Sequence, residues 1–576
     1  MRVLILLLGL SLASNPAFAG GEKPNIVFIL ADDLGIGDVG CYGGERCLID
    51  TPNIDALAAG GLRFTDAHVN ASVCGPTRRA IMTGRYNWRF GATVNHGPWG
   101  FCGPRPNTEK STLGKLLKRS GYRTGYVGKW HLGTTMVTLD GKKQGLTNVD
   151  FTKPLKHGPV QFGFDESFIL PGSLDMYPYA FARNNVWQGE ITAQKGWSAF
   201  NRVGPAEKDF EDHKVLETFY TETESFIAKQ KKDNPFFLFL ALTAPHTPTS
   251  PGVDWRGKSK LGIYGDFVME VDHSIERVIK ALKKKGLEQN TLILFSSDHG
   301  PAPYAGNILK ATPAQIQQLE AKGHYPSGPH RGYKFSVYEG GLRVPLIARW
   351  PGVIAEGETC DALIGLNDFM ATFAKLTDTK LENHEAPDSI SFAKLLRKPK
   401  ARGTRQNLVM ESVVSFAMRD GNWKLCLCPG AGTPSGQVNS KGNDPSPDDA
   451  WQKALDQFEG MPKETDLLNA PFVQLFNLAN DLHEDKNLAA LHPDRVLQMV
   501  AQLKEQIENG RSTPGPKLNN DKKVRIVNTK DKRLPAFVRE WLTKSREKAQ
   551  TRRQDEGRIG TDASFGIRQG SMAFWF

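Results

Sequence analysis

Short, continuous apolar runs recur in the sequence, and they constrain the fold more than any other feature. Residues 25–30 read NIVFIL, and similar runs occupy residues 122–128, 236–242, 291–295 and 344–348. An unbroken apolar run of this length is typical of a β-strand buried on both faces. Such strands belong to sheets that are covered by other elements on either side.

Helical patterns lie between these runs, at residues 53–59, 112–120, 214–229 and 264–285. Strands that alternate with helices favour an α/β fold, in which a mostly parallel central sheet is flanked by helices. The pattern changes after Asn383. Residues 408–418 and 423–427 are predicted as short antiparallel strands with a hairpin turn at Asp420-Gly421. A strand at 473–477 and a helix at 494–507 are predicted to complete a smaller C-terminal subdomain with an antiparallel sheet and a helix.

The first nineteen residues resemble a secretory signal peptide. Arg2 provides the charged start, residues 3–13 the apolar run, and Ala17-Phe18-Ala19 the cleavage site. The run is too short to span a membrane, and no later stretch reaches eighteen apolar residues. We therefore expect a secreted or periplasmic protein with no membrane span. The predicted division is a signal peptide at 1–19, a main domain at 24–385, a C-terminal subdomain at 400–510 and a basic tail at 511–576.

Most of the net charge of +11 lies in that last segment, which has 16 Lys and Arg against 7 Asp and Glu. A solvated tail is the simplest interpretation, although Phe537, Val538, Trp541 and Leu542 have the spacing of one short amphipathic helix. A more specific hypothesis is attraction to a polyanionic glycan or an envelope surface. Nucleic acid is not expected as a partner, because the chain has an export signal and no recognised nucleic-acid module.

Polar residues follow the predicted strands, where sites form in sheets of this kind. They are Asp32 and Asp33, Lys129 and His131, His246, and Asp298 and His299. Three carboxylates and an imidazole suggest a site for a divalent cation, with Ca²⁺ preferred and Mg²⁺ as the alternative. The imidazole is a softer ligand than calcium prefers. An aspartate after a strand also caps helices or forms turns, and that interpretation stays open.

Residues 74–85 read CGPTRRAIMTGR and follow the pattern Cys-x-Pro-x-Arg, extended by Thr-Gly. The sequence around Pro76 is expected to put Cys74 at or just before a helix N-terminus, where backbone amides and the helix dipole favour negative charge. The alternative is a buried thiol or half of a disulfide. Seven cysteines are present; setting Cys74 aside leaves an even number, which is compatible with disulfides but does not establish them.

The pattern at Cys74 resembles the signature of the type I sulfatases, which belong to the alkaline phosphatase superfamily. In that family a formylglycine-generating enzyme oxidises the cysteine to formylglycine, and the hydrated aldehyde is the nucleophile. Four further segments resemble family motifs: GKWHLG at 128–133, APHTP at 244–248, SSDHG at 296–300 and GYKFSVYEGGLRVP at 332–345. The resemblance covers roughly residues 24–490.

The resemblance implies a role for each of these residues. Asp32, Asp33, Asp298 and His299, together with the residue formed from Cys74, would hold the metal ion. Lys129, His131 and Lys334 would contact the sulfate or the hydrated aldehyde, His246 would protonate the leaving group, and Arg78 would pair with formylglycine and the metal-bound carboxylates. Considered singly, each has an ordinary alternative: a surface lysine, a core histidine or a surface ion pair.

We therefore expect a sulfuric ester hydrolase that cleaves sulfate monoesters, with a sulfated carbohydrate as the preferred substrate class over another sulfated small molecule. The alternatives are a phosphodiesterase or phosphonate monoester hydrolase of the same superfamily, or a non-catalytic protein that binds sulfated glycans. Specificity is expected in the segments 87–106, 173–197 and 301–330. The candidates there for a wall facing the sugar, with ordinary loop packing as the alternative, are Trp88, His96, Trp99, Trp187 and His330.

Overall fold

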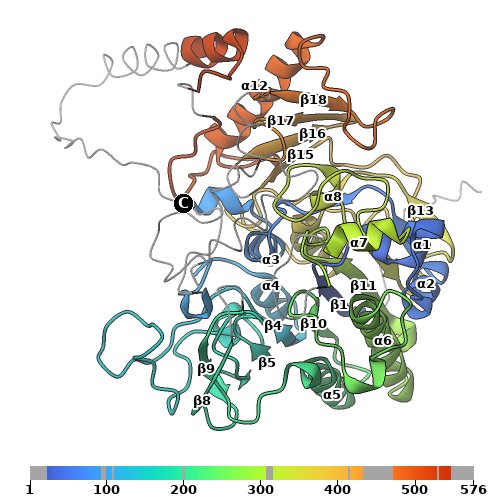
Figure 1. The fold of residues 1–576 in the computed structure, drawn as a ribbon, viewed down its shortest axis with the longest axis vertical. Coiled ribbons are helices and arrows are strands. Elements are labelled where there is room, and N and C mark those ends of the chain that lie inside the picture. Colours follow the sequence, from blue (N-terminus) through green and yellow to red (C-terminus); the bar gives the residue numbers. More distant parts are fainter. Residues whose placement is uncertain are drawn as a thin grey trace, which may run out of the picture.

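The computed structural model describes residues 23–91, 99–106, 109–196, 201–306, 315–412, 415–432, 471–527 and 531–545 (Figure 1). The predicted signal peptide at 1–19 lies outside these residues, as does the end of the predicted tail from residue 546 onwards. In the described part of the chain, no helix is both long enough and apolar enough to cross a membrane.

A ten-stranded sheet forms the centre of the molecule, in the order β13-β2-β12-β11-β1-β10-β4-β5-β6-β7. Its middle five strands are parallel to one another: β11 (Thr291–Ser297), β1 (Asn25–Asp32), β10 (Phe236–Pro245), β4 (Arg123–Lys129) and β5 (Glu166–Leu170). The mostly parallel sheet predicted from the apolar runs is confirmed. The run at 344–348 yields β12 (Leu346–Arg349), which lies antiparallel to β11.

The outer strands of this sheet are short. Two separate two-stranded sheets are also built from short strands. The outer strands are β2 (Leu62–Phe64), β13 (Glu358–Cys360), β6 (Ala182–Arg183) and β7 (Val186–Trp187). The small sheets pair β3 (Ala67–His68) with β14 (Ile364–Gly365) and β8 (Ala193–Lys195) with β9 (Gly204–Ala206).

Alternate residues of β1 enter two different hydrophobic cores, as the two-residue period of a strand requires. Ile26, Phe28 and Leu30 belong to the core that includes α3 (Cys74–Thr83), α4 (Leu113–Arg119) and α9 (Phe369–Leu376). Val27 and Ile29 belong to the other core, with α2 (Pro52–Ala59), α5 (Val215–Ala228) and α6 (Ile263–Lys284). Helices therefore cover both faces of the sheet, which explains why its strands are apolar on both sides. The shorter helices are α1 (Gly40–Gly43), α7 (Gln315–Ala321) and α8 (Glu339–Leu342).

A four-stranded antiparallel sheet lies at one end of the molecule, with α12 (Pro493–Asn509) beside it (Figure 1). Its strands are β15 (Asn407–Glu411), β16 (Phe416–Asp420), β17 (Trp423–Cys426) and β18 (Gln474–Asn477). The single strand predicted at 408–418 is wrong: this stretch contains two strands, β15 and β16, which pair antiparallel to one another. The predicted hairpin turn is confirmed, with Gly421 in the left-handed region at φ 56°.

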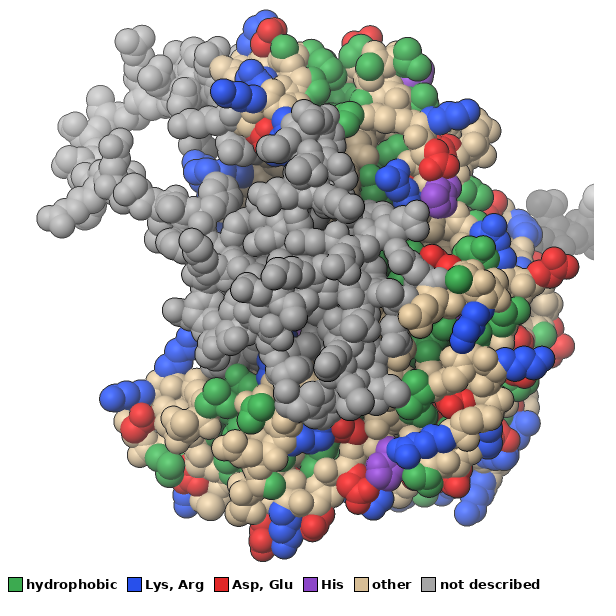
Figure 2. All heavy atoms as spheres, viewed as in Figure 1, with side chains coloured by type: hydrophobic (Ala, Val, Ile, Leu, Met, Phe, Trp, Pro, Cys, Tyr) green, Lys and Arg blue, Asp and Glu red, His purple; other side chains and the backbone are tan. Residues whose placement is uncertain are grey.

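The segment after Arg511 departs from the solvated tail that its composition predicts. Residues 536–545 form the short helix that the spacing of their apolar residues indicates, and both Val538 and Leu542 are buried in the main core. Upstream, Asp521 pairs with Arg85 of the main domain at 3.0 Å. The few apolar residues of this basic segment are therefore enough to hold its described part against the body. On the face shown in Figure 2, basic and acidic side chains are interspersed over the described surface.

Candidate active site

The site lies at the carboxyl ends of the neighbouring strands β11, β1, β10 and β4. Asp32 is the last residue of β1, Lys129 is the last residue of β4, and His246 directly follows β10. Asp298 and His299 directly follow β11. The sequence rule that placed the polar groups at strand exits thus brings them together, because these parallel strands end at one edge of the sheet.

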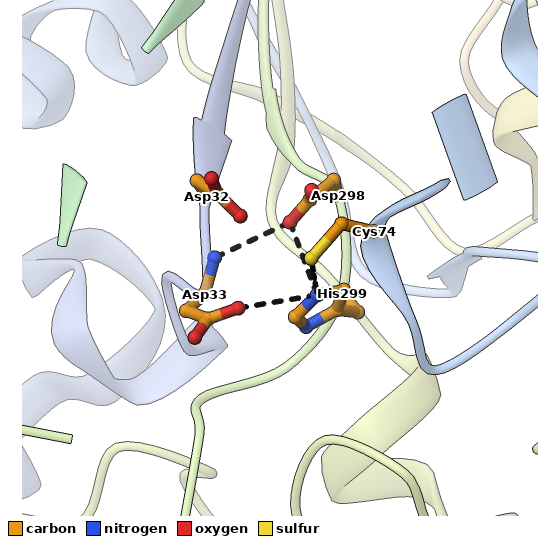
Figure 3. Close-up of side chains that lie close together, drawn as sticks. All are labelled: Asp32, Asp33, Cys74, Asp298 and His299. Atoms are coloured by element: carbon orange, nitrogen blue, oxygen red, sulfur yellow. Dashed lines mark hydrogen bonds and ion pairs between the residues drawn. The ribbon is translucent and has the colours of Figure 1, made fainter. Parts of the chain in front are cut away.

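Three of these side chains form one compact group with Asp33 and with Cys74 of α3 (Figure 3). Asp32, Asp33, Cys74, Asp298 and His299 each offer one ligand atom, and these atoms all lie within 4.8 Å of one another. Nε2 of His299 is 3.1 Å from Oδ1 of Asp33 and 3.5 Å from Oδ1 of Asp298. It is also 3.2 Å from Sγ of Cys74.

The backbone conformation of Asp33 brings its side chain into the same group as that of its neighbour Asp32. Consecutive side chains of a strand point to opposite faces. Asp33 leaves the strand with φ 64°, in the left-handed region that non-glycine residues seldom adopt. Both aspartates consequently contribute to the same group, and the interpretation of this pair as helix caps or turn residues does not account for their carboxylates.

The chemistry of the group fits a divalent cation. Nδ1 of His299 lies 2.9 Å from the carbonyl of Gly300, which can only accept, so Nδ1 carries the proton and Nε2 presents its lone pair to the group. Carboxylate oxygens and Nε2 are all acceptors, and they converge where a cation would compensate them. Oδ1 of Asp32 is buried and accepts no hydrogen bond from the described residues.

Three buried cations surround the carboxylates. Lys129 donates to Oδ2 of Asp32, and Lys334 donates to Asp33 at 2.8 and 3.1 Å. Arg78 contacts Oδ2 of Asp298 at 2.9 Å, and its guanidinium is only 2% exposed. The surface alternatives proposed for Lys129, Lys334 and Arg78 are therefore wrong, because all three side chains lie inside the site.

Burial and crowding separate the pKa values of the three carboxylates. Burial raises the pKa of Asp33 to about 7; the charge of Lys334 opposes this shift, while Asp32 and Asp298 reinforce it. Burial and the charge of Asp32 raise the pKa of Asp298 to about 6. For Asp32, burial is outweighed by the charge of Lys129, by His246 in its protonated form and by the charge of Arg78, so its pKa lies well below the usual range. One carboxylate is thus firmly ionised, and two gain most from a cation.

Helix α3 presents Cys74 and Arg78 to the group. Cys74 is its first residue and Val73, extended at φ −145°, precedes it, so position 74 lies at the helix end where backbone amides lack intrahelical partners. Arg78 follows one turn later and lies on the same side of the helix. Burial raises the pKa of the Cys74 thiol well above its ordinary value, so the unmodified sulfur is a poor nucleophile.

Two histidines complete the inner surface. Nε2 of His246 is 3.7 Å from Oδ2 of Asp33. Burial and the charges of Lys334 and Lys129 hold the pKa of His246 well below its ordinary value. His131 follows β4 with φ 50°. Burial and the charges of Lys129 and Arg78 lower the pKa of His131 in the same way. The surroundings of both imidazoles therefore favour the neutral form.

Asp175 is a site residue that the sequence reasoning missed. Its Oδ1 is buried, accepts no hydrogen bond from the described residues and lies 3.9 Å from Nδ1 of His246. Its Oδ2 accepts from Arg202 at 3.0 Å. Asp175 follows β5, the next parallel strand beyond β4, so the rule used for the other strand exits could have found it.

A comparison with known families matches residues 24–379 to the family described as Sulfatase. This match covers more than half of the chain and includes every residue of the site described above. The chain belongs to the sulfatase family. It is accordingly an enzyme of the sulfuric ester hydrolase class.

Curated relatives of this sulfatase act on different sulfate esters, as their names state. An N-acetylgalactosamine-6-O-sulfatase of Bacteroides thetaiotaomicron is 30% identical over 533 residues, which cover 84% of this chain and 93% of the relative. The N-acetylgalactosamine-6-sulfatase of Rattus norvegicus is 32% identical over 396 residues, 67% of each chain. The steryl-sulfatase of the same species is 32% identical over 430 residues, covering 65% of this chain and 70% of the relative.

Solved sulfatase structures share the fold. A sulfatase from a study of glycosaminoglycan metabolism in Bacteroides thetaiotaomicron superposes with a TM-score of 0.70 at 28% identity, covering 84% of this chain and 99% of the other. A sulfatase from Pseudoalteromonas sp. gives a TM-score of 0.62 at 24% identity, covering 84% and 90%. The predicted α/β fold with a smaller antiparallel subdomain is confirmed.

The aromatic residues suggested as a sugar-facing wall have mostly structural contacts in this sulfatase. Trp88 is 4% exposed and packs between Tyr86 and Phe416. Trp187 is buried against Phe151. Ordinary packing therefore describes these two tryptophans. His96 and the side chain of Trp99 lie outside the described residues.

Proposed function

We propose that this sulfatase hydrolyses sulfate monoesters of carbohydrates, with hydrated formylglycine at position 74 as the nucleophile and a divalent cation, Ca²⁺ before Mg²⁺, beside it. The relatives named for N-acetylgalactosamine 6-sulfate support a sugar substrate. We also propose that the chain is exported, with removal of residues 1–19, after a formylglycine-generating enzyme has converted Cys74. In the structure, Sγ of Cys74 stands where the hydroxyls of the hydrated aldehyde would be.

The observation that carries the proposal is the balance of charge in the site. The carboxylates of Asp32, Asp33 and Asp298 face the cationic groups of Arg78, Lys129 and Lys334. These six charges cancel. A divalent cation would leave the site with an excess of two positive charges, which matches an anionic sulfate ester bound at the N-terminus of α3.

Asp32, Asp33, Asp298 and His299 would hold the cation, whose charge makes a neighbouring hydroxyl more acidic. One hydroxyl of residue 74 loses its proton to a carboxylate such as Asp298 and attacks sulfur. The Asp298 carboxylate suits this step because its ligand atom lies in the same compact group as that of residue 74.

The surrounding cations stabilise the transferring group. Lys129, Lys334 and Arg78 offset negative charge on its oxygens, and their burial makes each interaction stronger than it would be in water. His246 donates a proton to the departing alkoxide from its imidazolium form, which the negative charge of the bound sulfate ester stabilises. Its ring faces Asp33 through Nε2 and the carbonyl of Thr247 through Nδ1, which fixes its orientation.

Release of sulfate uses the second hydroxyl of residue 74. His131 accepts the proton of that hydroxyl, the bond between the residue 74 carbon and the sulfate oxygen breaks, sulfate leaves and the aldehyde returns. His131 suits this role because burial and the charges of Lys129 and Arg78 lower its pKa. The lowered pKa favours the neutral imidazole, which is the form that can accept a proton. An ordinary serine has no second hydroxyl with which to expel the sulfate.

Mass spectrometry of the tryptic peptide that contains Cys74, from protein made with a formylglycine-generating enzyme, tests the nucleophile. We expect the thiol to be replaced by the aldehyde, and the matured protein to release sulfate from 6-sulfated N-acetylgalactosamine or a related sugar. An unmodified thiol, under conditions that convert another sulfatase, would overturn the mechanism. Faster turnover of phosphodiesters or phosphonate monoesters than of any sulfated sugar would favour the other hydrolases of the superfamily.

A further inference from the structure

Lys334 is presented by a loop, residues 331–340, whose two ends meet. The amide of Gly340 donates to the carbonyl of Arg331 at 2.7 Å and closes the loop. Within it, the amide of Lys334 donates to the carbonyl of Pro301, and the amide of Phe335 donates to the carbonyl of Ser72. Phe335 has φ 75°, a left-handed conformation that needs support from its surroundings.

One residue of the C-terminal part, Glu484, contacts both ends of this loop. Its Oε2 accepts from the amide of Glu339 at 2.6 Å, at one end. Its backbone carbonyl accepts from Nη1 of Arg331 at 3.2 Å, at the other end. Glu484 is fully buried and has φ 61°, so its own backbone is also held in the left-handed region.

Buried charges fix Glu484 in place. Lys424 of β17 lies 2.9 Å from Oε1 of Glu484 and 2.9 Å from Oε1 of Glu339. Glu339 also accepts from His68 and Arg343, each at 2.8 Å. Moving Glu484 out of this group would separate buried charges from their partners, so the group resists displacement.

The same group contains Asp66, His68 and Glu339, whose ligand atoms lie close enough to hold a metal ion. Its acids are already matched: Arg343 and Arg419 pair with Asp66 at 2.7 and 3.2 Å, and Lys424 pairs with Glu339. With its cationic positions filled by protein side chains, this group is a structural ion-pair network rather than a second metal site.

We propose that Glu484 is a positioning residue of the sulfatase: by joining both ends of the loop 331–340, it sets the position of the Lys334 ammonium group in the active site. The inference rests on the proposed role of Lys334 in binding sulfate. Lys334 reaches the centre through a flexible side chain, so the position of its backbone decides where the charge lies. A displacement of about 1 Å in a catalytic group can cost on the order of 100-fold in rate.

Two substitutions separate the carboxylate of Glu484 from its backbone. Glu484→Gly removes the carboxylate but accepts φ 61° without strain. Glu484→Gln keeps one acceptor, which can serve either the Glu339 amide or Lys424 but not both. With matured, cation-loaded protein, we expect the Kd for inorganic sulfate, measured by titration calorimetry, to rise roughly tenfold or more in Glu484→Gly and less in Glu484→Gln.

Hydrogen exchange gives a readout that does not depend on catalysis. We expect the amides of Lys334 and Phe335 to exchange faster in Glu484→Gly, because the amide of Glu339 at one end of the loop has lost its hydrogen bond to the Glu484 carboxylate. Met499→Ala is the matched control: it empties a buried position on α12 and lowers stability without touching the loop, so sulfate affinity should stay as in the wild type. A folded Glu484→Gly protein with unchanged sulfate affinity and unchanged exchange would overturn the proposal.

Lys334→Ala distinguishes this inference from the proposed function. If Lys334→Ala binds inorganic sulfate as tightly as the wild type, the role assigned to Lys334 is wrong, whatever the exchange data show. If Lys334→Ala loses sulfate binding and the Glu484 variants do not, Lys334 keeps its role and Glu484 does not position it. Should Glu484→Gly fail to fold, Glu484→Gln decides by the same two measurements.

Discussion

The sulfur of Cys74 lies 3.2 Å from Nε2 of His299, although 225 positions separate the two residues in the sequence. The first residue of α3 and the residue pair after β11 are thus brought into contact across the end of the sheet. This contact joins the position of the proposed nucleophile to the group that would hold the cation. The proposed nucleophilic attack and the proposed binding of the cation therefore depend on the same few side chains.

Removing the side chain at position 74 should abolish turnover without unfolding the protein. Cys74→Ala lacks the nucleophile, and we expect a loss of at least about 10³-fold in kcat. Cys74→Ser retains one hydroxyl, so it should accept sulfate once and then stop, which intact-mass measurement would detect as a sulfated protein. Cys41→Ser, a change at a half-buried cysteine outside the site, should keep full activity. A Cys74→Ala protein with wild-type turnover would contradict the mechanism.

Removal of the cation should lower both stability and activity. Three carboxylates lie within one small buried group, so their mutual repulsion is relieved when a divalent ion binds. At a concentration 100 times its Kd, the ion should add about 2.7 kcal/mol to the free energy of unfolding. Thermal melts after chelation, with Ca²⁺ or Mg²⁺ then restored, measure this effect. His299→Ala should weaken the response, whereas Asp233→Asn, at an exposed position, should leave it unchanged.

His246→Ala should affect different substrates unequally. A proton donor matters most when the departing alkoxide is strongly basic, as a sugar alkoxide is. We expect a loss of roughly 10²–10⁴-fold in kcat on a sulfated sugar but a much smaller loss on an aryl sulfate with an acidic phenol. Measuring kcat on both substrates with one preparation tests this. Equal losses on the two would argue against His246 as the acid.

The local parts of this fold were readable from the sequence because short-range patterns encode them. Apolar runs marked the strands β1, β4, β10 and β11, and the polar residues that follow them met at one edge. The burial of Lys129 and Lys334 was not readable in the same way. The local sequence around a lysine at a strand end or in a loop can be the same whether its ammonium group points to solvent or to a buried carboxylate. Only the family resemblance indicated that Lys129 and Lys334 belong to the site.

Long-range docking accounts for what the sequence did not reveal. The spacing of Phe537, Val538, Trp541 and Leu542 indicates an amphipathic helix but not the surface that covers it, and Val538 and Leu542 are buried in the main core. Glu484 lies in a turn-rich stretch whose composition predicts exposure, and it is held inside by Lys424 and the amide of Glu339. In each case the packing partners are remote in sequence, and no local sequence pattern identifies them.

Asp388 should be a major stabilising residue of the main domain. Its carboxylate accepts from Arg89 at 2.7 and 2.8 Å, and both side chains are fully buried. It also accepts from the amide of Ser512, which ties the segment after α12 to this pair. Asp388→Ala would leave the Arg89 charge unpaired, so we expect a loss of about 3–5 kcal/mol in the free energy of unfolding.

Denaturant unfolding compares Asp388→Ala with a matched exposed pair. Glu190 contacts Lys208 at 3.1 Å, and the two side chains are 70% and 49% exposed. Glu190→Ala should change stability by less than about 1 kcal/mol, because water screens this pair. Similar losses in the free energy of unfolding for both variants would show that burial does not increase the contribution of the Arg89–Asp388 pair to stability.

Glu270 of α6 should make stability fall as the pH rises from about 4.5 to about 8. Burial raises the pKa of Glu270 from 4.5 to about 8; the amide of Gly252 opposes the shift, and Glu217 and Asp254 add to it. The folded protein therefore keeps this proton when the unfolded chain has lost it. The resulting stabilisation is complete below pH 4.5 and is lost as the pH rises through about 8, at about 1.4 kcal/mol per pH unit between these values.

Glu270→Gln stays neutral and retains an acceptor for Gly252, so it should match the wild type near pH 4.5 and exceed it in stability at pH 8. Denaturant midpoints at both pH values measure the difference, and parallel pH profiles for the two proteins would show that Glu270 is ionised in the fold.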